Sequence, residues 1–314
     1  MKKINIVISG WGNIGRAAAR VYQMEKENNP ENDIELVGII RRNVVADDGY
    51  PAGVPVVTDI RELTAPVHVV LCCGPNHALK NDVVKFLEMG IATVDTFDSH
   101  KEINEYREIY NKIAIANKTV SILGSGWDPG LFSIVRALFA QLSPRYETFT
   151  NFGPGRSMGH TTIVKEQSPY IRNAVSITKY GATPGAHKRE VYVEVMPGSP
   201  LDNADEQEKL RDKILAHPYF KNDDSHIYFV ESIAEYDTSK HGGRLLNESA
   251  DSKIELTLNG DNPMMTANMM HASARAAHRA VLAGQFGCFT TVERPPLDFI
   301  PGETVAERLN RIKY

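Results

Sequence analysis

The sequence is poor in cysteine, has no long apolar run and shows no excess of basic residues. Its three cysteines, Cys72, Cys73 and Cys288, are too few for a disulfide scaffold, and we expect buried, reduced thiols. The apolar run Ile4–Ile8 is shorter than the roughly 7–15 residues of a signal-peptide core, and no run approaches the ~18 residues of a membrane span. The net charge of −4 lacks the basic excess of a typical nucleic-acid binder. We therefore expect a cytoplasmic protein that binds neither nucleic acid nor membrane.

Metal-binding patterns are also missing from the sequence. There is no HExxH motif and no pair of cysteines or histidines at a spacing typical of a zinc site. The ten histidines are scattered along the chain. The sequence therefore predicts no metal site.

Short apolar runs alternate with helix-like stretches through the first part of the 314-residue chain. Strands that alternate with helices of ten or more residues form βαβ units with a parallel sheet. The runs are continuous rather than alternating, which is typical of a sheet covered on both faces. We predict strands at 4–9, 34–40, 67–73, 92–97 and 120–124, and helices at 14–25, 76–89, 103–117 and 130–141.

The pattern changes near residue 145, where the predicted strands become longer and more alternating. Fewer helices separate them, which indicates a mostly antiparallel sheet with helices on one face. A short final helix is expected in the tail, which contains three prolines. We predict strands at 147–152, 174–180, 189–195, 227–233 and 253–258, and helices at 206–216 and 264–282.

A glycine motif follows the first predicted strand and opens the first predicted helix. Gly10, Gly12 and Gly15 form GxGxxG: Gly10 allows a tight turn, Gly12 lets the backbone approach a pyrophosphate, and Gly15 permits close helix–strand packing. The helix N-terminus offers free N–H groups to phosphates. The alternative is a glycine-rich turn without a ligand. In this context the motif predicts a Rossmann-type dinucleotide-binding domain.

These patterns together predict an α/β protein with two domains, as its length also indicates. We expect an N-terminal Rossmann-type parallel sheet and a second α+β domain that binds the substrate. Because the tail is expected to return to the first domain, that domain is assigned residues 1–125 plus about 290–314, and the second domain residues 126–289. The Met- and Ala-rich helix at 264–282 is expected to pack within the subunit or across a dimer interface.

The end of the second predicted strand indicates which dinucleotide is bound. An NAD site usually carries an acidic residue there, which accepts hydrogen bonds from the ribose hydroxyls. This sequence instead has Arg41, Arg42 and Asn43, and two guanidinium groups suit a 2′-phosphate. A pair of solvated surface arginines is the alternative. The sequence therefore predicts NADP as the cofactor.

Two carboxylates follow neighbouring predicted strands, at the edge where the nicotinamide is expected. Asp98 comes after the fourth strand and Asp128 after the fifth. Two carboxylates there suit a substrate ammonium, which they would hold in charge-assisted hydrogen bonds. Each aspartate is alternatively a helix N-cap, and Pro129 favours this for Asp128 because proline is common at the first helical position.

The combination of motifs over nearly the whole chain resembles one family, the meso-diaminopimelate dehydrogenases. The segments that carry the resemblance are GWGNIGR, IIRRN, VDTFDSH, GSGWDPGLFS, NFGPGRSMGH, HKREVYVE, HGG and DNPMMTA. No single segment is specific, whereas the combination is. The resemblance is closest to the shorter members of the family.

The resemblance implies a reversible, NADP-dependent oxidative deamination of the D-configured carbon of meso-2,6-diaminoheptanedioate. The products are L-2-amino-6-oxoheptanedioate, which cyclises to tetrahydrodipicolinate, together with ammonia and NADPH. This places the protein in lysine and cell-wall precursor biosynthesis, and implies a homodimer formed by the second domain. Asp98 and Asp128 match the family's residues at the reacting centre and are the predicted catalytic residues. The proton acceptor stays open between these two carboxylates and water.

The resemblance also implies which residues hold the substrate. At the distal L-centre, Arg189 would offer a planar fork to a carboxylate. Arg189 is alternatively a strand-surface arginine, and His241 alternatively caps a turn. The family often has Trp where this chain has Phe152, so Phe152 is assigned packing only. The predicted substrate-binding residues are Asp98, Trp127, Asp128, Phe152, Met158, Gly159, Thr178, Arg189, His241 and Asn262.

The predicted cofactor-binding residues lie in the loops at the carboxyl ends of the first-domain strands. His77 is expected to begin a helix and not to act in catalysis. The set is Gly10, Trp11, Gly12, Asn13, Ile14, Gly15, Arg41, Arg42, Asn43, Gly74, Pro75, Asn76, His77, Phe97, Ser99, Pro129, Gly130, Leu131, Phe132 and Ser133.

Other functions fit the residues less well. A related amine or amino-acid dehydrogenase with another substrate is the nearest alternative, and it need not keep Arg189 with both aspartates. A dihydrodipicolinate reductase would need a His-rich helix start with a downstream Lys and SGT, and an aspartate-semialdehyde dehydrogenase would need a mid-chain cysteine nucleophile. Both features are missing. A non-catalytic NADPH-binding protein is the alternative from another class, because a dinucleotide fold alone does not prove catalysis.

Overall fold

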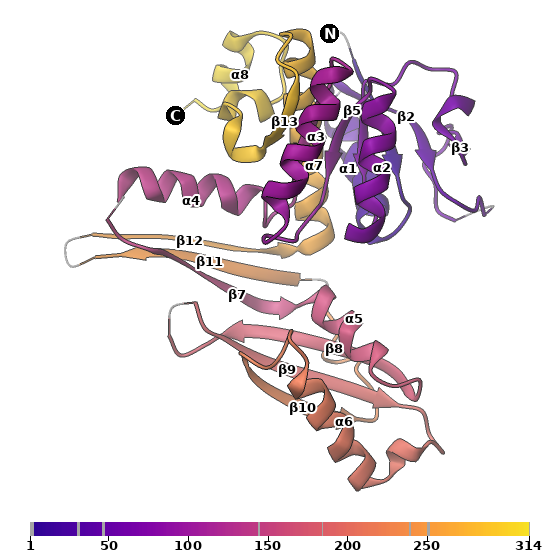
Figure 1. Ribbon diagram of the computed structural model, residues 1–314, viewed down its shortest axis with the longest axis vertical. Coiled ribbons are helices and arrows are strands. Elements are labelled where there is room, and N and C mark those ends of the chain that lie inside the picture. Colours follow the sequence, from indigo (N-terminus) through magenta and orange to yellow (C-terminus); the bar gives the residue numbers. More distant parts are fainter. Residues whose placement is uncertain are drawn as a thin grey trace. The chain divides into compact units, whose positions relative to one another are not determined.

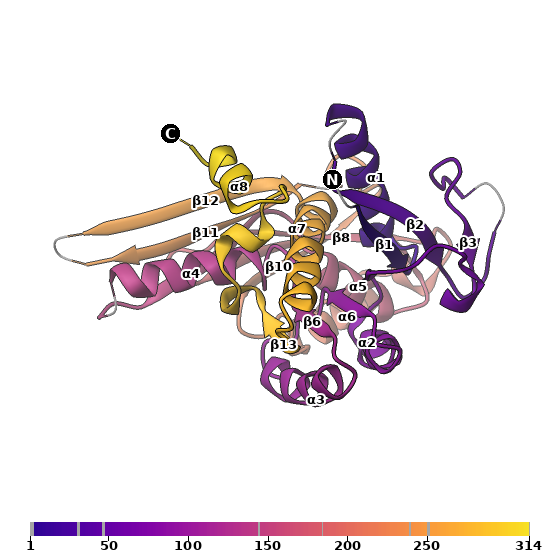
Figure 2. The ribbon, with the colours of Figure 1, turned by 90° about the horizontal axis from the view of Figure 1, so that it is seen from above.

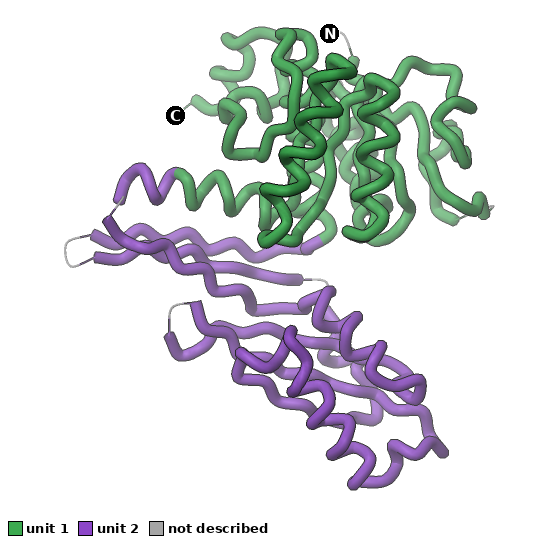
Figure 3. Tube along the Cα trace, in the orientation of Figure 1, with its two compact units in different colours: residues 1–137, 263–314 green, residues 138–262 purple. Residues whose placement is uncertain are grey.

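The computed structural model describes residues 3–29, 32–45, 48–143, 145–183, 185–238, 240–249 and 252–313. They form two compact units (Figure 3). The first unit comprises residues 1–137 and 263–314, and the second unit residues 138–262. These bounds differ from the predicted ones, because the compact first unit also contains residues 126–137 and 263–289.

The first unit is built on a seven-stranded sheet in which every paired strand is parallel. Its strands are β1 (Ile4–Ser9), β2 (Ile34–Ile40), β3 (Val56–Val57), β4 (Val69–Cys72), β5 (Ala92–Asp95), β6 (Val120–Leu123) and β13 (Gly287–Thr290), in the order β13-β6-β5-β4-β1-β2-β3. The predicted parallel sheet is confirmed. The tail returns to this unit as expected, and it adds β13 beside β6.

Helices cover both faces of this sheet. One face carries α1 (Asn13–Asn28) and α7 (Asn262–Leu282), and the other carries α2 (Asn76–Glu88) and α3 (Ile103–Ala116). Figures 1 and 2 both show α2 and α3 next to each other. This double cover explains why most residues of the central strands are apolar and buried.

Helix α7 packs into the core of the first unit. Ala267, Ala274 and Ala277 are fully buried there, and their small side chains allow the helix to lie close to its neighbours. Near the middle of α7, the buried Arg275 pairs with Asp33 at 2.9 Å. The Met- and Ala-rich pattern therefore marks packing within the subunit, one of the two expected outcomes.

The second unit is built on a six-stranded sheet in the order β10-β9-β8-β7-β11-β12. The β9–β10 pair is parallel and the other printed pairs are antiparallel. The strands are β7 (Thr148–Arg156), β8 (Ile171–Tyr180), β9 (His187–Val195), β10 (Asp224–Val230), β11 (Lys240–Glu248) and β12 (Lys253–Asp261). Helices α5 (Met158–Glu166) and α6 (Ala204–Ala216) pack on one face through a shared apolar core. The mostly antiparallel sheet is confirmed, but α5 and β11 were not predicted.

The remaining helices are short or connect the two units in sequence. They are α4 (Leu131–Leu142), α8 (Val305–Arg311) and 3-10 helices at Ile60–Glu62, Pro200–Asp202, Thr291–Glu293 and Pro296–Phe299. Among the helices of the described residues, none combines the length and the apolar character needed to span a membrane.

Candidate active site

The GxGxxG loop turns tightly between β1 and α1. Gly10 has a φ of +104°, a conformation that L side chains rarely adopt. A Cβ on Gly15 would lie 2.0 Å from the carbonyl oxygen of Gly10, so only glycine allows this close approach. A Cβ on the exposed Gly12 would meet nothing within 4 Å. The loop therefore leaves open space at the start of α1, where N–H groups face a bound anion in this kind of turn.

A charged and aromatic cluster lies beside this loop, at the end of β2. Arg41 donates to Asp48 and to the hydroxyl of Tyr50, both at 2.5 Å. Arg16 of α1 donates to the same carboxylate at 2.6 Å, and these two cations lower the pKa of Asp48. Trp11 donates to the Asp48 carbonyl at 3.0 Å and its ring lies 4.9 Å from Tyr50. Two guanidinium groups around one carboxylate leave this corner with a net positive charge.

Arg42 and Asn43 follow Arg41 and are exposed. Arg42 is near enough to Asp82 of α2 to oppose the rise that burial causes in the pKa of Asp82. The two predicted arginines therefore differ in their surroundings: Arg41 is held in a cluster, whereas Arg42 is a more exposed cation.

Asp98 lies in the loop after β5 and contacts the first residue of α2. Its Oδ1 accepts from the amide nitrogen of Asn76 at 2.6 Å, and its carboxylate is exposed. Asp98 does not cap a helix, because α3 begins at Ile103 with Glu102 as its N-cap. The structure thus brings together two predicted site residues, Asp98 and Asn76. His77 lies in the first turn of α2, as expected.

Asp128 is held by an arginine that the sequence interpretation missed. Both oxygens of Asp128 accept from Arg136 of α4, each at 2.7 Å, in a bidentate pair. The Asp128 side chain is 1 % exposed. The N-cap alternative is not what the structure shows, since α4 begins at Leu131 and the carboxylate faces Arg136. Trp127, the preceding residue, is buried with its ring 5.0 Å from Phe132.

The loop that follows Asp128 is compact. A Cβ on Gly130 would lie 1.8 Å from the carbonyl oxygen of Gly126, and the Gly130 N–H donates to the Ser133 hydroxyl at 3.2 Å. Pro129 and Gly130 are buried. This rigid turn fixes where α4 starts, and so where Arg136 reaches back to Asp128.

In the second unit, β8 and β9 bring Thr178 and Arg189 together. The two residues are opposite each other in the antiparallel register, and Arg189 donates to the Thr178 hydroxyl at 2.6 Å. The Arg189 Nε donates to Asp223 at 2.5 Å. Arg189 is 7 % exposed, so it is not a strand-surface arginine. Burial lowers the pKa of its guanidinium, and Asp223 opposes that shift.

Three histidines surround this arginine, and all are shifted toward the neutral form. Burial, reinforced by the charge of Arg189, lowers the pKa of His160 and of His241 to about 4. The same causes lower the pKa of His187. These imidazoles are therefore neutral near pH 7. Among the described residues, no group of three or more His, Cys, Asp or Glu side chains is arranged to hold a metal ion.

His241 and Phe152 both join this histidine group. His241 lies inside β11, opposite Gly155 of β7, and is buried, so it does not cap a turn. The backbone N–H of Phe152 donates to His187 Nε2 at 2.8 Å, and the two rings stack with centroids 5.4 Å apart. The packing role expected for Phe152 therefore has a defined partner.

The other predicted substrate residues of the second unit lie at element ends. Met158 and Gly159 begin α5, where Ser157 contacts His160 at 2.8 Å. Asn262 is the first residue of α7. The first turn of α5 therefore carries both predicted residues beside His160, whose pKa is lowered by burial and by the charge of Arg189.

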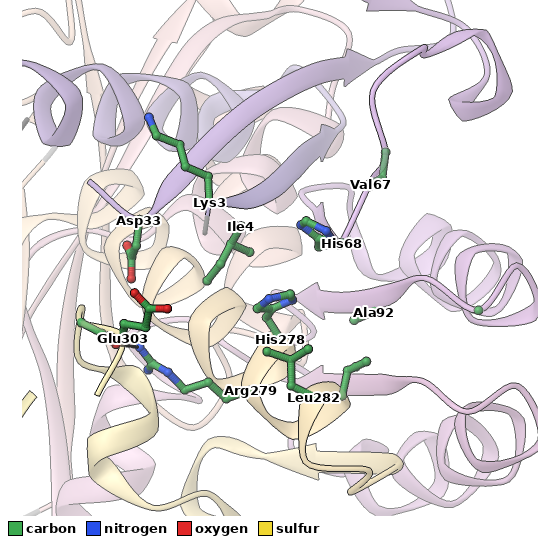
Figure 4. A pocket seen from close by; sticks show the side chains of 13 residues that line it. Lys3, Ile4, Asp33, Val67, His68, Ala92, His278, Arg279, Leu282 and Glu303 are labelled. Atoms are coloured by element: carbon green, nitrogen blue, oxygen red, sulfur yellow. Dashed lines mark hydrogen bonds between the residues drawn. The ribbon is translucent and has the colours of Figure 1, made fainter. Parts of the chain in front are cut away.

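A cavity lies at the edge of the parallel sheet opposite the GxGxxG loop. It has a volume of about 420 Å³ and is lined by residues near the amino ends of β1, β4 and β5, together with α7. Figure 4 shows the rings of His68 and His278 next to each other, with Arg279 and Glu303 further along the lining. Parallel α/β sheets bind ligands at the carboxyl ends of their strands. The cavity is therefore separate from the dinucleotide loop.

Comparisons with known proteins agree with the geometry. Residues 126–261 match the family model of the diaminopimelic acid dehydrogenase C-terminal domain. The meso-diaminopimelate D-dehydrogenase of Bacteroides fragilis is 35 % identical over 311 residues, which covers 96 % of this chain and 97 % of the relative. That of Corynebacterium glutamicum is 30 % identical and covers 94 % of this chain and 95 % of the relative.

The chain belongs to the meso-diaminopimelate D-dehydrogenase family.

Two solved structures support the same assignment. One, described as the C. glutamicum DAP dehydrogenase in complex with DAP, has a TM-score of 0.83 at 29 % identity and covers 100 % of both chains. Another, an engineered D-amino acid dehydrogenase bound to NADP+, has a TM-score of 0.79 at 27 % identity and covers 99 % of this chain and 100 % of the other. The fold predicted from the sequence is thus the fold of the meso-diaminopimelate D-dehydrogenase family.

Asp95 is a further residue of this site that sequence reasoning missed. It is fully buried at the end of β5, and its Oδ1 accepts from the backbone N–H groups of Phe97 and Gly124, each at 3.0 Å. Burial raises the pKa of Asp95 to about 6, and the two N–H donors oppose that rise. One side chain therefore ties the loop of Asp98 to the loop of Asp128. An acidic residue within an apolar strand was the signal in the sequence.

Replacing Asp95 by alanine is expected to destabilise the first unit by about 2–6 kcal/mol. The reason is that two buried N–H donors lose their acceptor, and each unsatisfied donor costs about 1–3 kcal/mol. Urea unfolding followed by circular dichroism measures the effect. Asp98→Ala is the matched control, because Asp98 is exposed and its loss leaves no buried donor. Equal unfolding midpoints for the two variants contradict the assigned role of Asp95.

Proposed function

We propose that the protein is an NADP-dependent meso-diaminopimelate dehydrogenase. It removes a hydride and ammonia from the D-configured carbon of meso-2,6-diaminoheptanedioate in a reversible oxidative deamination. The observation that carries the proposal is the buried Arg189, held by Thr178 in the second unit of a chain whose first unit bears a GxGxxG loop with Arg41 beside it. The curated relatives named meso-diaminopimelate D-dehydrogenase match nearly the whole chain.

The first unit is suited to bind NADP. The open space over Gly12 and the turn at Gly10 accommodate a pyrophosphate at the start of α1. Arg41 and Arg42, with Arg16, offer cations to a 2′-phosphate, and the Trp11–Tyr50 ring pair lies beside them. When bound, NADP+ accepts the hydride, which is chemistry that the protein itself does not supply.

The residues of the chain then orient the substrate and take a proton from its ammonium group. We assign Asp98 and Asp128 to the ammonium at the D-centre. We assign the proton acceptor to Asp98, because both oxygens of Asp128 accept from Arg136, whereas only Oδ1 of Asp98 accepts from a described side chain, the Asn76 amide. Loss of the hydride from carbon leaves an iminium, which water hydrolyses to the 6-oxo acid and ammonia. The product cyclises to tetrahydrodipicolinate.

The distal half of the substrate needs a different environment. A carboxylate at the L-centre is assigned to Arg189 and Thr178, with His241, Phe152, Met158, Gly159 and Asn262 completing the site. Because the surrounding imidazoles are neutral, the guanidinium of Arg189, paired with Asp223, is the cation that suits an anionic end of the substrate. Stereochemical choice follows because the two ends of the molecule meet different charges.

We also propose a cytoplasmic location and a homodimer formed through the second domain. Cys72, Cys73 and Cys288 are free and buried, which fits a reducing compartment. The family resemblance supports the dimer. Size-exclusion chromatography with light scattering tests it, and a monomeric mass at assay concentration contradicts it.

The proposal is tested by initial rates of NADPH formation from the meso, L,L and D,D isomers of diaminopimelate. We expect turnover of the meso isomer with NADP+, little with NAD+ and none with the L,L isomer, which has no D-centre. Turnover of another amino acid in place of the meso isomer would retain the dehydrogenase class and overturn the substrate. Absence of turnover with every amino acid tested contradicts the enzyme assignment.

A further inference from the structure

Arg189 shares its buried position with a carboxylate of opposite charge. Asp223 lies just before β10, and its Oδ2 accepts from Arg189 Nε at 2.5 Å. The side chains of both residues are largely buried, so water screens their charges little. The pair has no net charge, and the neighbouring His160, His187 and His241 are neutral. This part of the second unit is therefore a dipole and not a simple cationic site.

Both members of this pair keep a free hydrogen-bonding atom. Arg189 uses Nε on Asp223 and Nη1 on Thr178, which leaves Nη2 without a partner among the described residues. Asp223 uses Oδ2, and its Oδ1 lies 3.9 Å from His187 Nδ1, too far for a hydrogen bond. Both atoms are open to solvent, because neither is one of the buried polar atoms that lack a hydrogen-bond partner in the described residues. A donor and an acceptor are thus side by side and accessible.

We propose that Asp223 is a specificity-determining residue that accepts the distal ammonium of the substrate while Arg189 binds the distal carboxylate. An α-amino acid end carries both charges on one carbon, so it matches a guanidinium and a carboxylate held side by side. This inference rests on the proposed function, because it takes Arg189 as the group that meets the L-centre. It adds a reason why that end must be an amino acid and not a simple acid.

The charge arrangement has a consequence for substrate choice. A substrate with a distal carboxylate but no distal ammonium would place its anion near Asp223 without compensation. A charge-assisted hydrogen bond contributes about 1.5–3 kcal/mol, which corresponds to about ten- to a hundredfold in binding. Asp223 therefore selects meso-diaminopimelate over D-2-aminoheptanedioate, which has the same chain and the same D-centre but lacks the distal amine.

The test compares these two substrates in the full-length enzyme with NADP+. For the wild type we expect kcat/KM to favour meso-diaminopimelate by about ten- to a hundredfold, mainly through KM. Asp223→Asn should abolish most of this preference, because it lowers kcat/KM for the meso substrate and leaves or improves that for D-2-aminoheptanedioate. Asp224→Asn is the matched control, since Asp224 is exposed and contacts His226, and it should keep the preference.

Each outcome separates the inference from the proposed function. If Asp223→Asn lowers kcat/KM equally for both substrates, Asp223 only positions Arg189 and the specificity role is wrong. If the wild type uses both substrates equally well, the inference fails and the dehydrogenase assignment stands. If the wild type uses neither, the proposed function fails and the inference fails with it. Turnover of D-2-aminoheptanedioate by Asp223→Asn also shows that the variant is folded, and Asp223→Ser provides a second variant with the same expectation.

Discussion

Replacing Arg189 by glutamine is expected to lower kcat/KM for meso-diaminopimelate by about a hundred- to a thousandfold. Removing one member of a buried charge pair costs about 2–5 kcal/mol, because the partner charge, here Asp223, is left uncompensated. The substrate loses its only assigned cation at the distal end at the same time. Initial rates over a range of substrate concentrations measure the loss, which should fall largely on KM.

Arg189→Lys is the control for this prediction. Lysine keeps the charge opposite Asp223 but has no planar fork, so it should recover part of the activity and not all of it. Melting temperatures of both variants separate a binding loss from unfolding. A variant that is folded, binds NADP+ and retains wild-type kcat/KM without the guanidinium would show that Arg189 does not bind the substrate.

The second large effect is expected at the cofactor. Changing Arg41 and Arg42 together to serine should lower kcat/KM for NADP+ by about a hundred- to ten-thousandfold, because two charged hydrogen-bond donors to a 2′-phosphate contribute about 1.5–3 kcal/mol each. NAD+ has no 2′-phosphate, so its kcat/KM should change little. The ratio of the two values, measured on one preparation, gives the result directly.

Single variants and a remote arginine refine this second prediction. Arg41 also bonds Asp48 and Tyr50, whereas Arg42 is exposed, so the Arg41→Ser variant tests the cluster and Arg42→Ser the free cation. Arg61→Ser is the control, since Arg61 pairs with Asp59 on a 3-10 helix and should affect neither cofactor. An equal loss with NADP+ and NAD+ in the double variant contradicts the phosphate assignment.

Much of the first unit followed from the sequence, because its strands and helices are local patterns. The GxGxxG motif, the run after it and the apolar strand Ile34–Ile40 each predict structure from adjacent residues. The strand β13 did not follow, since only pairing with β6 makes Gly287–Thr290 a strand. Glycine and threonine at its two ends leave only Cys and Phe between them, so the segment lacks the longer apolar run that marked β4.

The second unit was harder to predict where glycine interrupts the pattern. β11 contains Gly242 and Gly243, which weaken any strand signal, yet it is paired on both sides by β7 and β12. A Cβ on Gly242 would lie 2.8 Å from the carbonyl oxygen of Gly153, so the glycine is required by close strands. α5 lies between the predicted strands 147–152 and 174–180, in a stretch for which no element was predicted.

The candidate site shows the same division between local and distant information. Asp98 and Asp128 were found from their places at strand ends, but their partners were not. Arg136 lies on α4, eight residues after Asp128 in the sequence, and its side chain reaches back to Asp128. This short separation was a signal that could have been used. Asp223 meets Arg189 only because β9 and β10 pair in parallel, and no local sequence pattern predicts that pairing.

Isotope labelling shows which carbon of the substrate gives up the hydride. Samples of meso-diaminopimelate carrying deuterium at the D-configured carbon or at the L-configured carbon are each oxidised with NADP+, and the reduced cofactor is analysed by mass spectrometry. We expect deuterium in the reduced cofactor, together with a slower rate, only when the D-configured carbon is labelled. Deuterium transferred from the L-configured carbon would contradict this expectation.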